Sequence, residues 1–264
     1  MNSLMNFFAA IGRWWLGVLF GLGRMGIFFL CTLRGIIYPP GKTPLVIKNI
    51  YFIGHKSLFV IIFTGAFSGM VLGLQGYYAL SRYGSEGFLG SGVVLSLVRE
   101  LGPVLTALMI VGRAGSAMCA EIGIMRIDEQ IDALRCMSID PHGYLVLPRL
   151  IAALISFPLL THIFDVVGVW GGYAVGVGLL GVNPGAYWDG IYRSLEWLDI
   201  WMGIVKSLAF AVLTITISTY KGYYAGVDRG SMGAEDVGEA TTSAVVTSSV
   251  TVLVSDYVIT SIMM

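Results

Sequence analysis

Hydrophobic residues run through this chain in long stretches that short polar segments interrupt. Five stretches have the roughly 20 residues that a helix needs to cross a bilayer. They cover residues 57–80, 89–111, 144–180, 200–220 and 241–264. Within the first, Gly65, Gly69 and Gly73 recur every four residues, a spacing that lets a second helix approach closely. The pattern therefore predicts an all-α integral membrane protein, with residues 1–264 forming a single transmembrane domain.

The first 41 residues are also apolar, but Arg13, Arg24 and Arg34 divide them into runs of about ten, too short to span a bilayer. We expect an amphipathic helix lying in the membrane interface, with a single tilted span as the alternative. Pro39-Pro40-Gly41 should end this helix, and residues 42–56 should form a short basic connector.

The segment 122–137 has the periodicity of a surface helix. Large apolar residues fall on one helical face, at steps of three and four: Ile124, Ile127, Ile131 and Leu134. Polar and charged residues fill the remainder, among them Arg126, Glu129, Gln130, Asp132 and Arg135. The apolar face should rest on the membrane domain. The polar face is either plain solvated surface or the contact surface for a cytosolic partner.

Composition and charge agree with a membrane protein. The chain is 56% hydrophobic and 12% charged, with a mean hydropathy of +0.80, whereas soluble domains carry about 25% charged residues. The formal net charge is zero, which argues against a nucleic-acid partner. Three widely spaced cysteines imply no disulfide framework.

The distribution of Lys and Arg predicts the orientation. If the span 57–80 leaves the cytosol, the cytosolic segments hold twelve basic residues and the opposite side only two, Arg82 and Arg193. Cytosolic loops of membrane proteins are enriched in basic residues. The C-terminus should therefore lie outside the cytosol.

Two charged residues inside the second span are the strongest candidates for function. Arg99 and Glu100 lie about ten residues into an apolar helix, where a charge costs at least about 2.5 kcal/mol. Neighbours on a helix point about 100° apart, so these two should not pair with each other. They could line a polar path, or form a structural ion pair with another helix, with Lys206 of the fourth span as a candidate partner for Glu100.

Other motifs give weaker evidence of function. Gly41-Lys42-Thr43 and the glycines 176, 178 and 181 resemble nucleotide-binding loops in letters but lack the required context. His162 and Asp165 share a helix face, which suggests a proton relay, a metal pair or, as the favoured interpretation, a satisfied hydrogen bond within the membrane. One histidine and one carboxylate make an incomplete metal site. We expect no catalytic residues, no metal and no ATP site on this chain.

Two blocks of sequence resemble the MlaE (YrbE) permease family. The first comprises Arg99-Glu100-Leu101-Gly102-Pro103, the run from Gly112 to Ala117, and Met125-Arg126 followed by Glu129-Gln130. The second is GAEDVGEATTSAVV, from Gly233 to Val246. Members are membrane subunits of ABC transporters that move phospholipid between the two membranes of Gram-negative bacteria. The resemblance implies that the segment 122–137 is a coupling helix seated in a groove of a cytosolic ATPase.

The resemblance also implies a lipid-binding pocket, bordered here by Leu72, Tyr77, Leu80, Tyr83, Arg99 and Glu100, with Lys206 beside them. Leucine side chains suit acyl chains, while tyrosine hydroxyls and a cation can hold the phosphate end.

The implied assembly contains two permease copies, an ATPase (MlaF-like) that binds the ATP, a periplasmic MCE-domain hexamer (MlaD-like) and often a STAS-domain subunit (MlaB-like). The location would be the bacterial inner membrane. The alternative is a proton-coupled secondary carrier of a hydrophobic substrate that uses Glu100, His162 and Asp165.

Overall fold

A computed structural model describes residues 2–35, 43–227 and 233–263, with side chains in the first helix described at residue 16 and from residue 19 onward. Every regular element in these ranges is helical. The α-helices are α1 (Asn2–Arg34), α2 (Thr43–Ile50), α3 (Lys56–Ser81), α4 (Leu89–Ser96), α5 (Gly102–Ile110), α6 (Ser116–Ile127), α7 (Gln130–Cys136), α8 (Leu147–Gly176), α9 (Pro184–Ser194), α10 (Trp197–Tyr223) and α11 (Ala234–Met263).

Short π-helical turns join several of these helices end to end. They are η1 (Tyr51–His55), η3 (Leu97–Leu101), η4 (Val111–Gly115) and η5 (His142–Val146), while η2 (Glu86–Phe88) is a 3₁₀ turn. In the described residues, five continuous helical segments are long and apolar enough to cross a membrane: Thr43–Ser81, Glu86–Ile127, His142–Gly176, Trp197–Tyr223 and Ala234–Met263. The predicted all-α membrane fold is confirmed.

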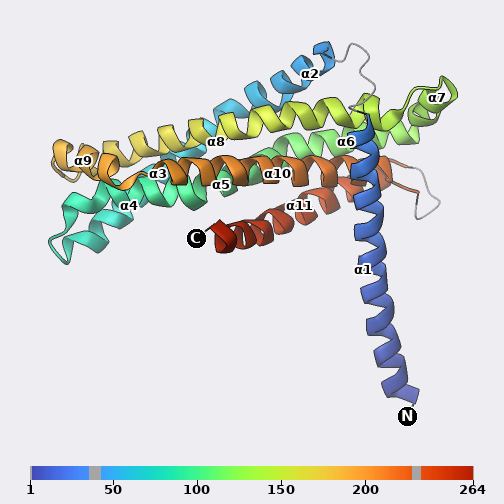
Figure 1. Ribbon diagram of the computed structural model, residues 1–264, viewed down its shortest axis with the longest axis horizontal. Helices are drawn as coiled ribbons and strands as arrows, with labels where there is room; N and C mark the ends of the chain where they lie inside the picture. The colour runs from blue at the N-terminus through green and yellow to red at the C-terminus, as the bar shows by residue number, and fades with distance from the viewer. Residues whose placement is uncertain (1, 36–42, 228–232, 264) are drawn as a thin grey trace.

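The long helices lie roughly side by side along one direction, whereas α1 crosses that direction steeply near the end of the bundle that carries α7 (Figure 1). The helix α9 lies at the opposite end. Exposed apolar side chains cover much of α1, including Leu16, Leu19, Phe20 and Ile27. A helix that lies across the bundle with an apolar exposed surface agrees with the predicted interfacial helix.

The predicted glycine stripe forms a close backbone contact between α3 and α8. Gly65, Gly69 and Gly73 are buried on α3. A Cβ atom added to Gly69 would lie 1.8 Å from the carbonyl oxygen of Gly168 in α8. The two backbones touch at this point, so only glycine fits.

Two of the predicted boundaries are wrong. The connector 42–56 is helical from Thr43, because α2 and η1 continue directly into α3. The third span ends as a helix at Gly176 rather than at 180, and turns follow it. The segment between the third and fourth predicted spans contains a further helix, α9. It begins at Pro184, after Asn183, whose side chain accepts hydrogen bonds from the Gly185 and Ala186 N–H groups.

The prediction of a single helix over 122–137 is also wrong. The segment is divided into the end of α6, at Ile127, and α7, which begins at Gln130. Glu129 adopts a left-handed conformation, with φ of 57°, and turns the chain. Ile131 is fully buried and Leu134 packs beside it, but Ile124 on α6 is 52% exposed. The apolar face thus divides, and only its α7 half rests on the membrane domain. Two of the sequence predictions, the helix break at Pro39–Gly41 and most of the rejected Gly41-Lys42-Thr43 motif, lie outside the described residues.

Candidate functional site

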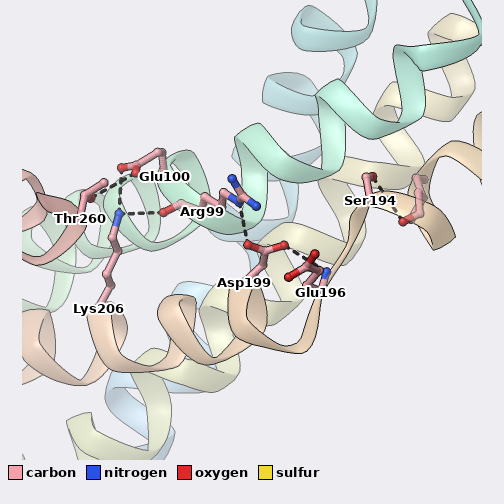
Figure 2. A network of polar contacts seen from close by, with 8 residues as sticks. Arg99, Glu100, Ser194, Glu196, Asp199, Lys206 and Thr260 are labelled. Carbon is pink, nitrogen blue, oxygen red and sulfur yellow. Dashed lines mark hydrogen bonds and ion pairs between the residues drawn. The ribbon is translucent and has the colours of Figure 1, made fainter. Parts of the chain in front are cut away.

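A fully buried lysine, Lys206 of α10, is the centre of a polar network inside the apolar bundle. Its Nζ lies 2.8 Å from Oε2 of Glu100 and 2.9 Å from Oδ1 of Asp256 in α11. It also donates a 2.7 Å hydrogen bond to the carbonyl oxygen of Arg99 (Figure 2). A buried ammonium is stable only when its three donors are matched in this way. The proposed ion pair between Glu100 and Lys206 is confirmed.

The local sequence explains why the Arg99 carbonyl is free to accept this bond. In an α-helix its partner would be the N–H of the residue four positions later, which here is Pro103 and has no N–H. The π-helical turn η3 spans the same residues. The proline and the turn therefore leave a backbone acceptor inside the bundle, and Lys206 satisfies it.

Arg99 forms a second ion pair, separate from the first. Its Nε donates a 2.7 Å hydrogen bond to Oδ1 of Asp199, a buried residue in the first turn of α10. The other carboxylate oxygen of Asp199 accepts from the backbone N–H of Glu196, which completes a capping box at the start of that helix. Arg99 and Glu100 thus point to different partners on the same helix, as expected for adjacent residues.

The helix α11 completes the network. Thr260 donates a 3.2 Å hydrogen bond to Oε1 of Glu100, and Asp256 one turn earlier contacts Lys206. The sequence reasoning gave no role to Asp199, Asp256 or Thr260. Asp256 could have been found, since a carboxylate inside an apolar span is itself a signal. Thr260 could not, because ten hydroxyl residues lie between Thr241 and Ser261 and several bond only their own helix.

The other predicted pocket residues lie at one end of α3 and just beyond it. Leu72, Tyr77 and Leu80 are half-buried and pack against the bundle core, whereas Tyr83 is 82% exposed in the turn after the helix. Among the contacts that the structure describes, none of these four residues is hydrogen-bonded to the network around Lys206. A single chain thus brings Arg99, Glu100 and Lys206 together and leaves the four α3-end residues as a second group.

The predicted coupling residues bond mainly to one another. Nη1 of Arg126 lies 3.0 Å from Oδ1 of Asp132, and Arg135 contacts the same oxygen at 3.3 Å. Nη2 of Arg135 also donates a 2.6 Å hydrogen bond to Oη of Tyr223, at the end of α10. Glu129 and Gln130 are exposed. The surface formed by α7 is therefore folded against the bundle by Arg126 and Arg135, with Glu129 and Gln130 facing outward.

Comparison of the sequence with those of known proteins identifies the family of this chain. The sequence profile of the family described as Permease MlaE matches residues 46–262. The chain belongs to the MlaE permease family. It is similar to a probable ABC transporter permease protein of Rickettsia bellii, 46% identical over 98% of both chains. It is also similar to the intermembrane phospholipid transport system permease protein MlaE of Haemophilus influenzae, 41% identical over 98% of both chains.

A chloroplast relative is more distant. The protein trigalactosyldiacylglycerol 1 of Arabidopsis thaliana is 36% identical over 79% of this chain and 58% of its own. The family assignment agrees with the resemblance found in the sequence. The alternative of a proton-coupled carrier has no support among these relatives. The Rickettsia bellii protein is named a probable ABC transporter permease, and the Haemophilus protein is named a permease of a phospholipid transport system.

In this MlaE family member, the predicted hydrogen bond between His162 and Asp165 is absent. Nδ1 of His162 lies 3.8 Å from Oδ2 of Asp165, beyond hydrogen-bond distance. Both carboxylate oxygens are buried without a hydrogen-bond partner in the described part of the chain. They lie against Gly102 of α5, where an added Cβ would come within 1.9 Å of Oδ1. The Asp165 side chain therefore packs closely against Gly102, with His162 at ion-pair distance on the same helix.

Proposed function

We propose that this chain is the membrane permease subunit of an ABC transporter that moves phospholipids between the inner and outer membranes of a bacterium. The observation that supports this most strongly is the full-length similarity to the Haemophilus protein, which is named for intermembrane phospholipid transport. The charged network inside the apolar bundle fits this role, because a path for lipid headgroups needs polar groups at membrane depth.

In this proposal, Arg99 is the headgroup contact. A guanidinium has five N–H donors, and Asp199 engages Nε while a third of the side chain stays exposed. Tyr77 and Tyr83 supply hydroxyls, and Leu72 and Leu80 supply apolar surface for the acyl chains. Lys206 and Asp199 hold Glu100 and Arg99 in place from α10. Lys206 itself is fully buried and so orients the site rather than touching the lipid.

A second copy of the chain would complete the pocket. The helix α11 exposes an apolar strip on one side, made of Val246, Val250, Val254 and Tyr257. These residues follow steps of three and four and so share one helical face. The same helix contributes Asp256 and Thr260 to the network. A homodimer that pairs the α11 strips would bring the two networks toward a shared central cavity.

Energy would come from a separate subunit. The chain would hold no ATP site of its own, and an MlaF-like ATPase would contact Glu129 and Gln130 at the α7 end. Arg135 and Tyr223 would carry the movement of α7 to α10. A periplasmic MlaD-like MCE hexamer, and in some systems an MlaB-like STAS subunit, would complete an inner-membrane complex with the α7 end in the cytosol and the C-terminus in the periplasm.

Purification from native membranes in mild detergent, with mass spectrometry of proteins and lipids, tests this proposal. We expect a Walker-motif ATPase, an MCE-domain protein and bound phospholipid to copurify. A dimer that carries neither protein partner would contradict it. The site is tested by Arg99→Ala and Tyr83→Glu in reconstituted complexes, with Arg193→Gln at an exposed position of α9 as the control. Normal lipid transport by both variants would place the pocket elsewhere.

A further inference from the structure

An apolar groove lies between the end of α6 and the first turn of α11, at the end of the bundle that carries α7 (Figure 1). Its volume is about 350 Å³. The lining comes from both helices and is mostly aliphatic: Ile124, Ile127, Asp128, Ala234 and Val237. Ile124 is 52% exposed, although its side chain is large and apolar. The helices touch at Val237, which lies 3.2 Å from a Cβ added to Gly123 of α6. The groove thus separates two helices that are in direct contact, and its apolar lining is open to the outside.

Carboxylates border this apolar lining on both sides. Asp128 lies in the groove and Glu129 follows it, while Glu235 adjoins the lining residue Ala234 in the first turn of α11. All three carboxylates belong to exposed residues. In the described part of the chain, the Asp128 side chain bonds only the neutral amide of Gln130, at 3.3 Å, and neither glutamate forms an ion pair. The groove therefore combines an apolar interior with an acidic rim.

The acidic rim distinguishes between three kinds of occupant. An acyl chain in the groove would hold the rim against the membrane surface, which is negative on the cytosolic side and repels carboxylates. A second copy of this chain, docked groove to groove, would place identical carboxylates opposite one another, which is costly. A protein segment with one apolar side chain between Lys or Arg residues matches both features. Protein interfaces are built in this way, from buried apolar anchors and complementary charges at the rim.

Both walls of the groove belong to helices that reach the charged network in the membrane. The first wall ends the continuous helical segment Glu86–Ile127, which contains Glu100. The second wall begins α11, which carries Thr260 near its other end. Thr260 donates a 3.2 Å hydrogen bond to Glu100. A partner seated between the walls would therefore act on the two helices that meet at this bond.

We propose that the groove binds the ATPase subunit of the transporter, through one large apolar side chain that basic residues flank. The apolar side chain would pack between Ile124 and Val237, and the flanking Lys or Arg side chains would pair with Asp128 and Glu235. This contact adds α11 to the elements that the ATPase moves, beyond the surface at α7. The identity of the partner rests on the proposed function.

A photocrosslinker in the groove identifies its occupant. Cells that express the full complex with Ile124→p-benzoyl-phenylalanine are irradiated, the complex is purified in mild detergent, and the adducts are sequenced by mass spectrometry. We expect an adduct with the ATPase, in a peptide that has Lys or Arg next to the captured side chain. The matched control is Ile155→p-benzoyl-phenylalanine, because Ile155 is also 52% exposed but lies in the apolar helix α8. It should capture no ATPase.

Capture of lipid alone at Ile124 would overturn the proposal. So would an adduct with a second copy of this chain, or with an ATPase peptide that has no basic residue beside the captured position. The same preparation tests the proposed function separately. If no ATPase copurifies, the proposed function fails and this inference fails with it. If the ATPase copurifies and is captured from Gln130→p-benzoyl-phenylalanine but not from Ile124, this inference alone fails.

The charge match is tested without the crosslinker. Asp128→Asn combined with Glu235→Gln keeps the shape of both side chains and removes two charges. The affinity of the ATPase for the permease should fall about fivefold at about 0.1 M salt, and the difference should shrink at about 1 M. Asp189→Asn is the control, because Asp189 is an exposed carboxylate of α9 at the opposite end, and it should have no effect. Unchanged affinity of the double variant at low salt would overturn the charge match and the proposal with it.

Discussion

Arg135 of α7 donates a 2.6 Å hydrogen bond to the hydroxyl of Tyr223, the last residue of α10. The ring of Tyr223 also stacks on His142, with centroids 5.0 Å apart. The helix α10 then continues to Lys206 and Asp199, which hold Glu100 and Arg99. One continuous helix, α10, thus connects the surface predicted to meet an ATPase with the charged network in the membrane.

Tyr223→Phe removes the hydroxyl and keeps the aromatic ring. Since the Arg135 side chain is half exposed, we expect only a small loss of stability, within about 1 kcal/mol. The amount of lipid moved per ATP hydrolysed should fall about fivefold, because a hydrogen bond contributes roughly 1 kcal/mol to the linkage. Transport and ATPase activity are measured together in reconstituted complexes.

The control for this variant is Tyr192→Phe, which removes an exposed hydroxyl from α9 at the opposite end. It should leave the ratio of transport to hydrolysis unchanged. If Tyr223→Phe also leaves this ratio unchanged, the link between α7 and α10 carries no coupling.

Lys206→Met leaves two carboxylates, Glu100 and Asp256, without their shared cation. Breaking a buried ion pair is costly, although Glu100 is 38% exposed and water will screen part of the charge. We expect the free energy of unfolding to fall by about 2 kcal/mol, seen as a lower melting temperature in detergent. Adding Glu100→Gln and Asp256→Asn to Lys206→Met should restore much of the loss. A triple variant no more stable than the single one would show that the charges are not the cause.

Gly69→Ala tests the contact between α3 and α8. The new methyl group would collide with the carbonyl of Gly168, and backbone atoms can move aside only by separating the helices. We expect a loss of at least about 2 kcal/mol, with poor expression as the extreme outcome. Gly92→Ala is the matched control, since an added Cβ at that helical position meets no atom within 4 Å. It should be neutral or stabilise the helix by about 0.5–1 kcal/mol. Equal melting temperatures for the two variants would contradict the packing argument.

Asp165→Asn replaces a carboxylate that has no hydrogen-bond partner in the described part of the chain with a neutral group of the same shape. A buried carboxyl group whose oxygens lack a hydrogen-bond partner is destabilising. We therefore expect an unchanged or higher melting temperature and normal lipid transport. Loss of transport in a well-folded Asp165→Asn protein would instead show that this carboxylate takes part in transport.

Local patterns predicted those parts of the molecule that depend on neighbours in the sequence. Runs of apolar residues indicated the membrane helices, and the four-residue glycine repeat indicated a close helix contact. The depth of Arg99 and Glu100 within an apolar run was enough to infer polar partners, because an unpaired charge there is too costly. Even the pairing of Glu100 with Lys206 followed, since few cations lie inside the spans.

Tertiary structure decided the features that depend on how the helices are rotated and where the chain turns. Asp199 and Asp256 could have faced lipid or solvent, and only the packing of α10 and α11 against η3 turned them toward Arg99 and Lys206. The apolar periodicity continues through Glu129, but the helix does not, because Glu129 adopts a left-handed conformation there. This turn lets α7 pack back against Tyr223 of α10. Periodicity determines which residues share a face, but the energy of packing against distant residues determines where that face points.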